Sequence, residues 1–322
     1  MREVLDIIKD KGYKKIALQF PEGLKEKAIE LAETIESKTN TLVFISSDPC
    51  YGACDLADRE MKDLGVEALF HFGHSPIIKK PDIPTYYIDI NIDFDVISLF
   101  DENLDLLPKK IGLITTIQHL HLLKKVKEFL EYRDFEVFIG KPLKRAMYEG
   151  QVLGCDFSSA RAIASLVDCF AFIGSGDFHA IGVALATKKR VLVFDITREV
   201  RDVQQKVEKI LKQRYAIIAR AMEADSFGIL IGEKKGQQRL SLALKIKEKI
   251  VKNGKKAFLL TIREITPENL YYIGIDAFVN TACPRVAIDD IAKFKKPMLN
   301  PKELEILLGE RKWEEYEMEE LL

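Results

Sequence analysis

Short apolar runs alternate with longer amphipathic stretches along the chain, and this pattern predicts an α/β protein. The apolar runs are nearly continuous, which is typical of strands buried on both faces of a parallel sheet. The amphipathic stretches place apolar residues three or four positions apart, as expected for helices that pack on one side. Because the pattern recurs at intervals of roughly 100 residues, the chain is interpreted as three copies of one α/β unit.

Each copy is predicted to contain a strand, a helix and then three further strands, followed by the next copy. The predicted first strands are 15–20, 111–115 and 227–231; the helices 25–37, 119–132 and 237–253; the second strands 41–46, 135–139 and 256–261; the third strands 68–72, 169–174 and 277–281; and the fourth strands 85–90, 190–195 and 296–299. The segment 197–225 is predicted to be one long connecting helix.

The boundaries fall near residues 96 and 196, which gives predicted domains 1–96, 97–195 and 196–322. We find no low-complexity linker between them, so the domains are expected to pack closely. The predicted fold is three related domains with short parallel sheets in a pseudo-threefold triangular arrangement. Ligands of such sheets sit beyond the carboxyl ends of the strands, where the first polar loops of the three copies lie.

The bulk composition limits the location and the partners of the protein. Of the 322 residues, 47% are hydrophobic and 31% are charged, and the net charge is −1. This balance does not indicate direct nucleic-acid binding or a membrane surface. Residues 1–10 are read as an amphipathic helix and not a signal peptide, and no apolar run approaches the ~20 residues of a membrane span. A cytoplasmic location is therefore expected.

Three of the five cysteines stand in separate motifs, one in each copy: Cys54, Cys155 and Cys283. A glycine stands one or two positions before each of the first two and an aspartate directly follows each of them, whereas Pro284 follows Cys283. Each is predicted at the start of a helix, where the backbone N–H groups stabilise a thiolate. Pro284 suits the first turn of such a helix. If the three copies close around one axis, the thiolates meet, and three thiolates can hold an iron–sulfur cluster with one iron left open.

The other two cysteines receive different interpretations. Cys169 lies in a predicted strand and is expected to be a buried apolar side chain. Cys50 precedes Cys54 by four positions, and its role is left open. His71 and His74 alternate at a strand end and are expected to be structural. Neither a paired C-x2-C zinc pattern nor a C-x3-C-x2-C motif occurs in the chain.

Several motifs together resemble one family, the archaeal diphthamide-synthesis enzymes that are 2-(3-amino-3-carboxypropyl)histidine synthases. The resemblance covers nearly the whole chain, and the cysteine contexts make it specific. The matching stretches are L-Q-F-P-E-G-L at 18–24, D-P-C-Y-G-A-C-D-L-A-D at 48–58, G-Q-V-L-G-C-D at 150–156, G-S-G-D-F-H at 174–179 and T-A-C-P-R-V-A-I-D-D at 281–290.

The resemblance implies a [4Fe–4S] cluster with Cys54, Cys155 and Cys283 as its ligands. It implies a homodimer that uses S-adenosylmethionine and an external electron donor. Such an enzyme cleaves a C–S bond of S-adenosylmethionine to give a 3-amino-3-carboxypropyl radical. The group is added to a histidine of translation elongation factor 2, which is the first step of diphthamide biosynthesis. Radical chemistry suits the imidazole carbon, which is a poor nucleophile, and the cofactor supplies the difficult step.

Six residues near predicted strand ends are candidates for contacts with S-adenosylmethionine, and each has a structural alternative. Gln19 and Glu22 follow the first strand, where a turn at 21–23 is the alternative. For His179, the alternative is a histidine with a purely structural role. For Arg285, the alternative is a surface ion pair. Gly174 and Gly176 allow close approach to a ligand or shape a turn.

Three alternative functions stay open. One is a dehydratase similar to quinolinate synthase, whose open iron acts on a small substrate. Another is a non-catalytic cluster protein that passes electrons to a partner, and a third is a structural zinc or metal-free binding domain. Elsewhere, Trp313 is assigned either to a subunit interface or to the edge of the core. The Lys- and Glu-rich stretches 201–212 and 302–320 are interpreted as solvated helix faces.

Overall fold

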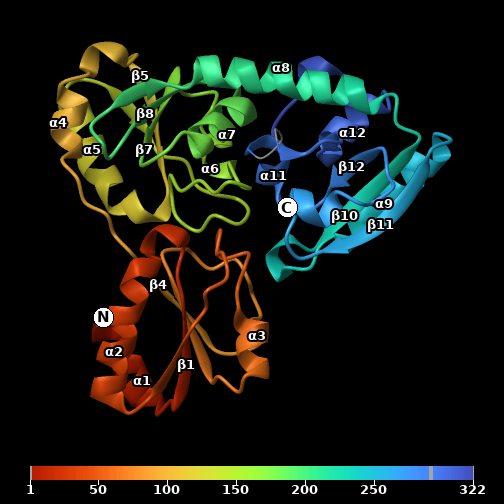
Figure 1. The fold of residues 1–322 in the computed structure, drawn as a ribbon. Helices are drawn as coiled ribbons and strands as arrows, with labels where there is room; N and C mark the ends of the chain where they lie inside the picture. The colour runs from red at the N-terminus through yellow and green to blue at the C-terminus, as the bar shows by residue number, and fades with distance from the viewer. Residues whose placement is uncertain (1, 290–292, 322) are drawn as a thin grey trace. The chain divides into compact units, whose positions relative to one another are not determined.

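The computed structural model describes residues 2–289 and 293–321, which form two compact units (Figure 1). Unit 1 comprises Met1–Ile92 together with Lys234–Gly236, and unit 2 comprises Asp93–Glu233 and Gln237–Leu322. Three sheets are present, and every strand pair described is parallel except β8 with β9. The predicted α/β class is therefore confirmed.

Unit 1 contains one parallel sheet with the strand order β2-β1-β3-β4. Its strands are β1 (Lys15–Gln19), β2 (Leu42–Ile45), β3 (Ala68–Phe72) and β4 (Thr85–Ile88). Gln19 pairs with His71 in the register of β1 and β3, so both residues lie at the carboxyl edge of the sheet.

Helices cover both faces of this sheet (Figure 1). On one face, α1 (Arg2–Lys11) and α2 (Ala28–Thr39) bury Ile8 and Ile35 with the apolar side chains of β1 and β3. The 3-10 helix η1 (Glu22–Lys27) leads into α2. On the other face, α3 (Asp58–Asp63) contributes Met61 to a second cluster. Burial on both faces explains why these strands read as continuous apolar runs.

The first sheet of unit 2 has the order β6-β5-β7-β8-β9. One face is covered by α4 and α5 and the other by α6 and α7, and each face has its own apolar cluster. The elements are α4 (Val96–Asp101), η2 (Leu104–Leu106), β5 (Lys110–Thr115), η3 (Ile117–His119), α5 (Leu120–Tyr132), β6 (Glu136–Phe138), α6 (Ser158–Arg161), β7 (Cys169–Ile173), α7 (Phe178–Thr187), β8 (Arg190–Phe194) and β9 (Val200–Asp202).

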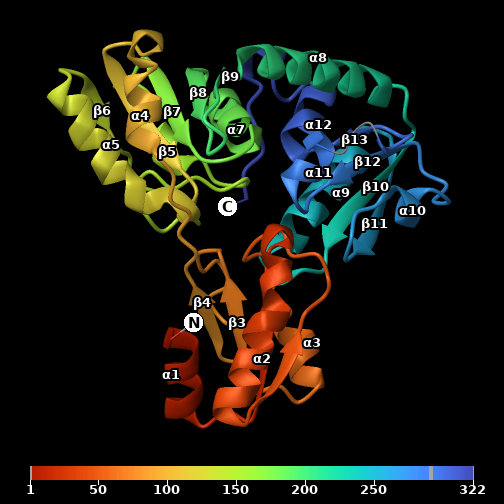
Figure 2. The same ribbon diagram turned by 60° about the vertical axis from the view of Figure 1, so that its left-hand side comes forward.

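The second sheet of unit 2 has the order β11-β10-β12-β13. Helices α9 and α12 pack on one face, and α10 and α11 on the other (Figure 2). The elements are β10 (Ser226–Gly232), α9 (Leu240–Lys252), β11 (Lys256–Ile262), α10 (Pro267–Leu270), β12 (Ala277–Asn280), α11 (Pro284–Asp289), β13 (Met298–Leu299), α12 (Pro301–Leu307) and η6 (Trp313–Glu315). The 3-10 helix η4 (Lys235–Gln237) follows β10, and its first two residues belong to unit 1.

The predicted connecting helix 197–225 is wrong in its first part. The chain first forms β9, which pairs antiparallel with β8, and the helix α8 spans only Gln204–Ala221. Arg201 in β9 forms an ion pair with Asp195 at 2.6 Å, which ties the strand to the end of β8. Helix α8 then packs on both sheets of unit 2, with Val207 in one cluster and Ile217 in the other (Figure 1).

All three sheets place the first strand of the copy second in the order, between the second and the third strand. This shared order confirms the repeated α/β pattern that the sequence predicts. The proposed domain boundaries and the triangular arrangement stay predictions. None of the helices in the described part of the chain combines the length and the apolar character needed to cross a lipid bilayer.

Candidate functional site

Cys54 lies in a half-buried turn of unit 1, in the loop between β2 and α3. The buried side chain of Gln19, at the end of β1, holds this loop at the two positions that flank Leu56. Its amide nitrogen donates to the Asp55 carbonyl at 2.8 Å, and its amide oxygen accepts from the Ala57 N–H at 3.2 Å. The loop that carries the cysteine is therefore fixed to the carboxyl edge of the sheet.

Residues 234–236 of unit 1 close over the Cys54 turn. Lys234 Nζ lies 2.6 Å from Asp55 Oδ2, and the two side chains are only 4% and 5% exposed. The Gly236 N–H donates to the Cys54 carbonyl at 3.2 Å. A Cβ atom on Gly236 would lie 2.4 Å from Cys54 Cα, so only glycine fits here without moving backbone. The backbone position of Cys54 thus depends on this contact.

Cys155 lies in a half-buried turn of unit 2 that is anchored by the next residue. The Asp156 carboxylate is fully buried and accepts from the backbone N–H groups of Arg145, Ala146 and Ser158 at 2.6, 2.8 and 2.8 Å. The N–H of Leu321 donates to the Cys155 carbonyl at 2.9 Å. Asp156 and the last described residue of the chain therefore set the position of this cysteine.

Cys283 follows β12 and directly precedes α11, which begins at Pro284. The buried Asn280 side chain shapes the turn, because its amide nitrogen donates to the Cys283 carbonyl at 2.7 Å and its oxygen accepts from the Ala282 N–H at 2.9 Å. The prediction that Cys283 stands at a helix start with Pro284 in the first turn is confirmed. The last residue of the motif at 281–290 lies outside the described residues.

The corresponding prediction for the other two cysteines is wrong. Helices α3 and α6 begin at Asp58 and Ser158, so three residues separate Cys54, and two separate Cys155, from the helix that follows. Their carboxylate neighbours use the backbone and Lys234 as partners, and this favours turns over an early helix start. Cys169 is confirmed as buried in β7, and burial raises the pKa of its thiol to about 11.

Within unit 2, Arg285 brings the Cys283 segment beside the Cys155 turn. Its guanidinium lies over the ring of Phe178, 4.0 Å from the ring centre, and an added Cβ on Gly154 would lie 3.3 Å from Arg285 Cδ. His179 follows Phe178 in α7 and is half-buried. Burial, assisted by the charge of Arg285, lowers the pKa of His179 to about 4. This corner offers a fixed cation and a neutral imidazole.

The other predicted contacts for S-adenosylmethionine have varied surroundings. Glu22 is exposed and pairs with Lys25 at 2.5 Å. Gly174 and Gly176 follow β7, and Gly176 has a φ of +71°, which favours glycine. The Gly176 N–H donates to the Asp195 carboxylate at 3.3 Å, so the glycine turn is joined to the end of β8.

The stretch 302–320 is predicted to be a solvated helix face, but the last two of its glutamates are buried. Glu319 and Glu320 are 5% and 4% exposed, and each is paired with an arginine. Arg239 contacts Glu319 at 2.8 Å, and Arg161 contacts Glu320 at 2.8 Å. Burial of such paired carboxylates cannot be read from composition alone. A run of charged residues has the same sequence pattern whether it faces solvent or pairs with residues elsewhere in the chain.

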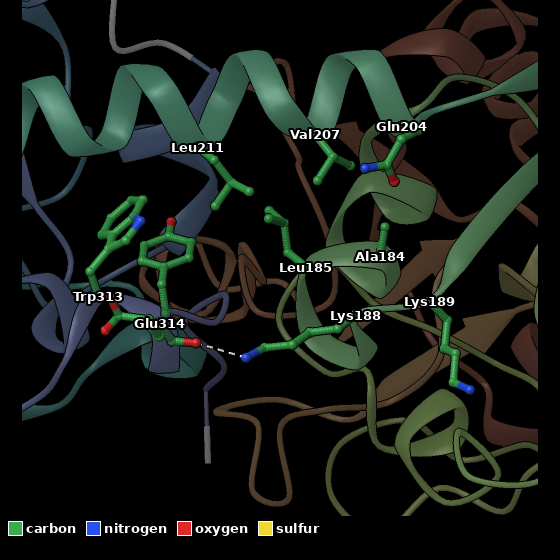
Figure 3. Close-up of a pocket in the computed structure, with 10 residues that line it drawn as sticks. Ala184, Leu185, Lys188, Lys189, Gln204, Val207, Leu211, Trp313 and Glu314 are labelled. Carbon is green, nitrogen blue, oxygen red and sulfur yellow. Dashed lines mark hydrogen bonds between the residues drawn. The ribbon is translucent and has the colours of Figure 1, made fainter.

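A separate pocket of about 300 Å³ lies between α7, α8 and the segment around Trp313 (Figure 3). Leu185, Val207 and Leu211 line its apolar side, and Lys188 Nζ donates to the Glu314 carbonyl at 2.8 Å. None of the cysteines described above lines it. Trp313 packs edge-on against Tyr215 at 5.2 Å and belongs to the rim of the core of unit 2.

Comparison with known proteins identifies the family. The family described as "Putative diphthamide synthesis protein" matches residues 20–318, a range that contains all three cysteine motifs. The chain belongs to this diphthamide synthesis family. The 2-(3-amino-3-carboxypropyl)histidine synthase of Pyrococcus horikoshii is 42% identical over 99% of this chain and 92% of its own length. Subunit 1 of the Caenorhabditis elegans synthase is 31% identical over 92% of this chain and 76% of its own length.

Solved structures of the family have the same fold. The crystal structure of Dph2 from Pyrococcus horikoshii with a 4Fe–4S cluster has a TM-score of 0.92 and 41% sequence identity. The match covers 100% of this chain and 93% of that chain. A second crystal structure of that protein gives the same score over 99% of this chain.

Proposed function

We propose that this protein is a 2-(3-amino-3-carboxypropyl)histidine synthase. It transfers the 3-amino-3-carboxypropyl group from S-adenosylmethionine to a histidine of translation elongation factor 2, the first step of diphthamide biosynthesis. The observation that carries this proposal is the near full-length similarity to the Pyrococcus horikoshii synthase. The family match gives no support to the dehydratase or to the electron carrier.

Cys54, Cys155 and Cys283 are the residues that would hold a [4Fe–4S] cluster. All three are half-buried, and each lies in a turn held by buried polar side chains. Thiolates are the ligands that such clusters require, and three of them leave one iron for the substrate. When bound and reduced, the cluster supplies the electron that breaks the C–S bond of S-adenosylmethionine.

The residues of the chain have the tasks of binding, orienting and shielding. Arg285 offers a cation to the carboxylate of the methionine part, and its stacking on Phe178 fixes the direction of the guanidinium. His179 adds a hydrogen-bonding group that is uncharged at neutral pH because of its lowered pKa. A neutral imidazole does not repel the sulfonium. Gly174, Gly176, Gln19 and Glu22 remain proposed contacts.

The protein substrate and the assembly follow from the same proposal. A histidine on a folded partner has to reach the cysteines, so the turns that carry them need to be accessible in the working enzyme. A homodimer, an external electron donor and a cytoplasmic location complete the proposal. The three-domain division at residues 96 and 196 gives each predicted domain one of the cysteines.

The test is anaerobic reconstitution with iron and sulfide, followed by reaction with elongation factor 2, S-adenosylmethionine and dithionite. We expect methylthioadenosine release and a mass increase confined to one histidine-containing peptide of the factor. A brown protein that binds S-adenosylmethionine but releases no methylthioadenosine on reduction would contradict the proposal. Methylthioadenosine release without modification of the factor would overturn the assignment of the protein substrate alone.

A further inference from the structure

A second group of metal-binding side chains lies in unit 1. Cys50, His71 and His74 place one ligand atom each within 4.8 Å of the others. Cys50 comes from the loop after β2, His71 from β3 and His74 from the turn after β3. Cys50 is 2% exposed and His71 is fully buried. The proposed function assigns no task to any of these three residues.

The hydrogen bonds around Gln19 fix which nitrogen of His71 carries a proton. The Gln19 amide oxygen already accepts from the Ala57 N–H, while its nitrogen donates to the Asp55 carbonyl. The same oxygen lies 2.9 Å from His71 Nδ1, so Nδ1 is the N–H donor. The lone pair of His71 is consequently on Nε2, which points toward His74 Nδ1 at 2.9 Å.

A metal ligand needs this arrangement. In metal sites, one ring nitrogen of a histidine binds the ion while the other donates to a protein oxygen that orients the ring. Gln19 has this role for His71, and the Tyr87 ring packs edge-on against the same imidazole at 5.5 Å. The proton shared between His71 and His74 occupies the place that an ion would take.

We propose that Cys50, His71 and His74 bind one divalent ion of the zinc class, distinct from the group held by Cys54, Cys155 and Cys283. One thiolate and two imidazoles form a ligand set that zinc favours, with bonds of about 2.3 Å to sulfur and about 2.0 Å to nitrogen. Ligand atoms around such a tetrahedral ion lie about 3.3–3.8 Å apart, so small side-chain movements within the observed cluster suffice. The fourth position is left for water or another small ligand.

Binding has a defined proton balance. Cys50 loses its thiol proton to solvent, and the proton on His74 Nδ1 leaves that atom, so that the second nitrogen of His74 carries it. Burial raises the pKa of the Cys50 thiol to about 12, and it lowers the pKa values of His71 and His74 to about 3 and about 4. The imidazoles are thus already neutral, and the ion displaces only the thiol proton.

The ion would fasten the cysteine-bearing loop to the sheet. Cys50 is in the same loop as Cys54, whereas His71 belongs to β3, so the bond to Cys50 joins the loop to the central part of the sheet. Loop closure by a metal restricts the unfolded chain and stabilises the folded loop. The site is therefore structural, and the inference holds whether or not the proposed transfer reaction is correct.

The experiment uses the full chain with Cys54, Cys155 and Cys283 changed to serine, which removes the other metal-binding thiols. Under anaerobic conditions, cobalt(II) is added as a spectroscopic probe. We expect one equivalent to bind with a thiolate-to-cobalt charge-transfer band and the visible bands of a tetrahedral site, and zinc should displace it. Adding Cys50→Ser should abolish the charge-transfer band, and adding His74→Gln should reduce the visible intensity.

Cys169→Ser in the same background is the matched control, because Cys169 is equally buried but lies in β7. It should leave the cobalt spectrum unchanged. If the triple variant does not fold, zinc and iron are measured in wild type and Cys50→Ser after cluster loading, and the variant should lose zinc but keep iron. No charge-transfer band in the folded triple variant, or a band that survives Cys50→Ser, would overturn the proposal. Equal zinc in wild type and Cys50→Ser would do the same.

Discussion

Buried polar side chains determine where the three cysteines lie. The Asp156 carboxylate accepts from three backbone N–H groups around the Cys155 turn. The Asn280 side chain likewise forms hydrogen bonds with the backbone beside Cys283. Asp55 pairs with Lys234 next to Cys54. A buried carboxylate that loses its partners costs far more than an exposed one, so these residues constrain the turns strongly. The cysteines themselves are half-buried.

The clearest prediction for single residues distinguishes the three proposed cluster ligands from Cys169. Cys54→Ala, Cys155→Ala and Cys283→Ala should each abolish turnover and lower the iron content, because two remaining thiolates cannot hold the cluster firmly. Cys169→Ala should retain both, since that thiol is buried in a strand. Iron analysis and methylthioadenosine release measure the two effects. Full turnover in any of the first three variants removes that residue from the ligand set.

His179 should make the stability of the protein depend on pH. Its pKa is lowered to about 4 in the folded state, against about 6.5 in an unfolded chain, so the unfolded state takes up a proton first as the pH falls. The contribution is complete above pH ~6.5 and is lost progressively toward pH ~4. In His179→Gln, urea unfolding should show a shallower pH dependence across this window. A variant slope equal to the wild-type slope would show that His179 is not held neutral.

Arg214 in α8 and Glu303 in α12 form a buried ion pair, with both side chains 1% exposed. Arg214 also donates to the Met298 carbonyl at 2.7 Å, and Glu303 accepts from Tyr316 at 3.1 Å. Arg214→Met leaves a buried carboxylate without its cation and should lower the unfolding free energy by about 3–5 kcal/mol. Denaturant unfolding measures this change.

Arg190→Met is the control for that prediction. Arg190 pairs with Asp202 at 2.7 Å, but both side chains are more than a third exposed, at 44% and 37%. Pairs of this kind contribute about 0–1 kcal/mol. If both variants lose the same small amount of stability, the buried pair of Arg214 and Glu303 contributes no more to the unfolding free energy than an exposed pair does.

At the scale of elements, the contact between Gly236 and Cys54 joins two segments far apart in the chain. Gly236→Ala would place a Cβ 2.4 Å from Cys54 Cα and 2.9 Å from its carbonyl oxygen, so backbone has to move. We expect a folded protein whose iron content and turnover fall by about tenfold or more, because residues that position metal ligands typically affect metal affinity or activity about 10–100-fold. Gly274→Ala is the control, since no heavy atom outside its own neighbourhood lies within 4 Å of an added Cβ there. Normal iron loading in Gly236→Ala would show that the turn adapts.

The sequence predicts the strands well because burial on both faces produces continuous apolar runs. For example, the pattern predicts the third strand of the first copy at 68–72, and β3 spans Ala68–Phe72. The hydrophobic pattern does not predict β9, because two of the three residues in Val200–Asp202 are charged and ion pairs of Arg201 with Asp177 and Asp195 fix the strand. Its position also depends on Asp177, which lies 24 residues earlier in the chain. The helical pattern of residues 204–221 follows directly, so the sequence does not indicate where β9 ends and α8 begins.

The site was predictable in part for the same reason. Cysteine motifs are local and carry a family resemblance, so Cys54, Cys155 and Cys283 stand out in the sequence. The anchors Gln19, Lys234 and Asp156 act through tertiary contacts, which a single sequence does not reveal. The sequence also does not indicate that Cys50, His71 and His74 lie close together. His71 and His74 look like ordinary strand-end histidines until β3 and the loop after β2 lie side by side.

At the scale of the whole molecule, the same strand order occurs in all three sheets, and each cysteine comes after the second or third strand of its copy. Repeated topology puts equivalent loops at equivalent sheet edges, as parallel α/β folds require. Cys54 belongs to unit 1, whereas Cys155 and Cys283 belong to unit 2. The proposed cluster would therefore take its ligands from three segments far apart in the chain.

Cluster loading should consequently protect three separate segments together. In hydrogen exchange, we expect slower exchange around residues 50–57, 150–157 and 281–285 in the loaded protein, by up to about a hundredfold if the cluster is present at a hundred times its dissociation constant. The Cys283→Ala variant should lose the protection at all three segments, although the substitution lies in only one, because binding is shared. Protection that persists at 50–57 in this variant would mean that Cys54 binds independently of unit 2, and the three-cysteine site would be wrong.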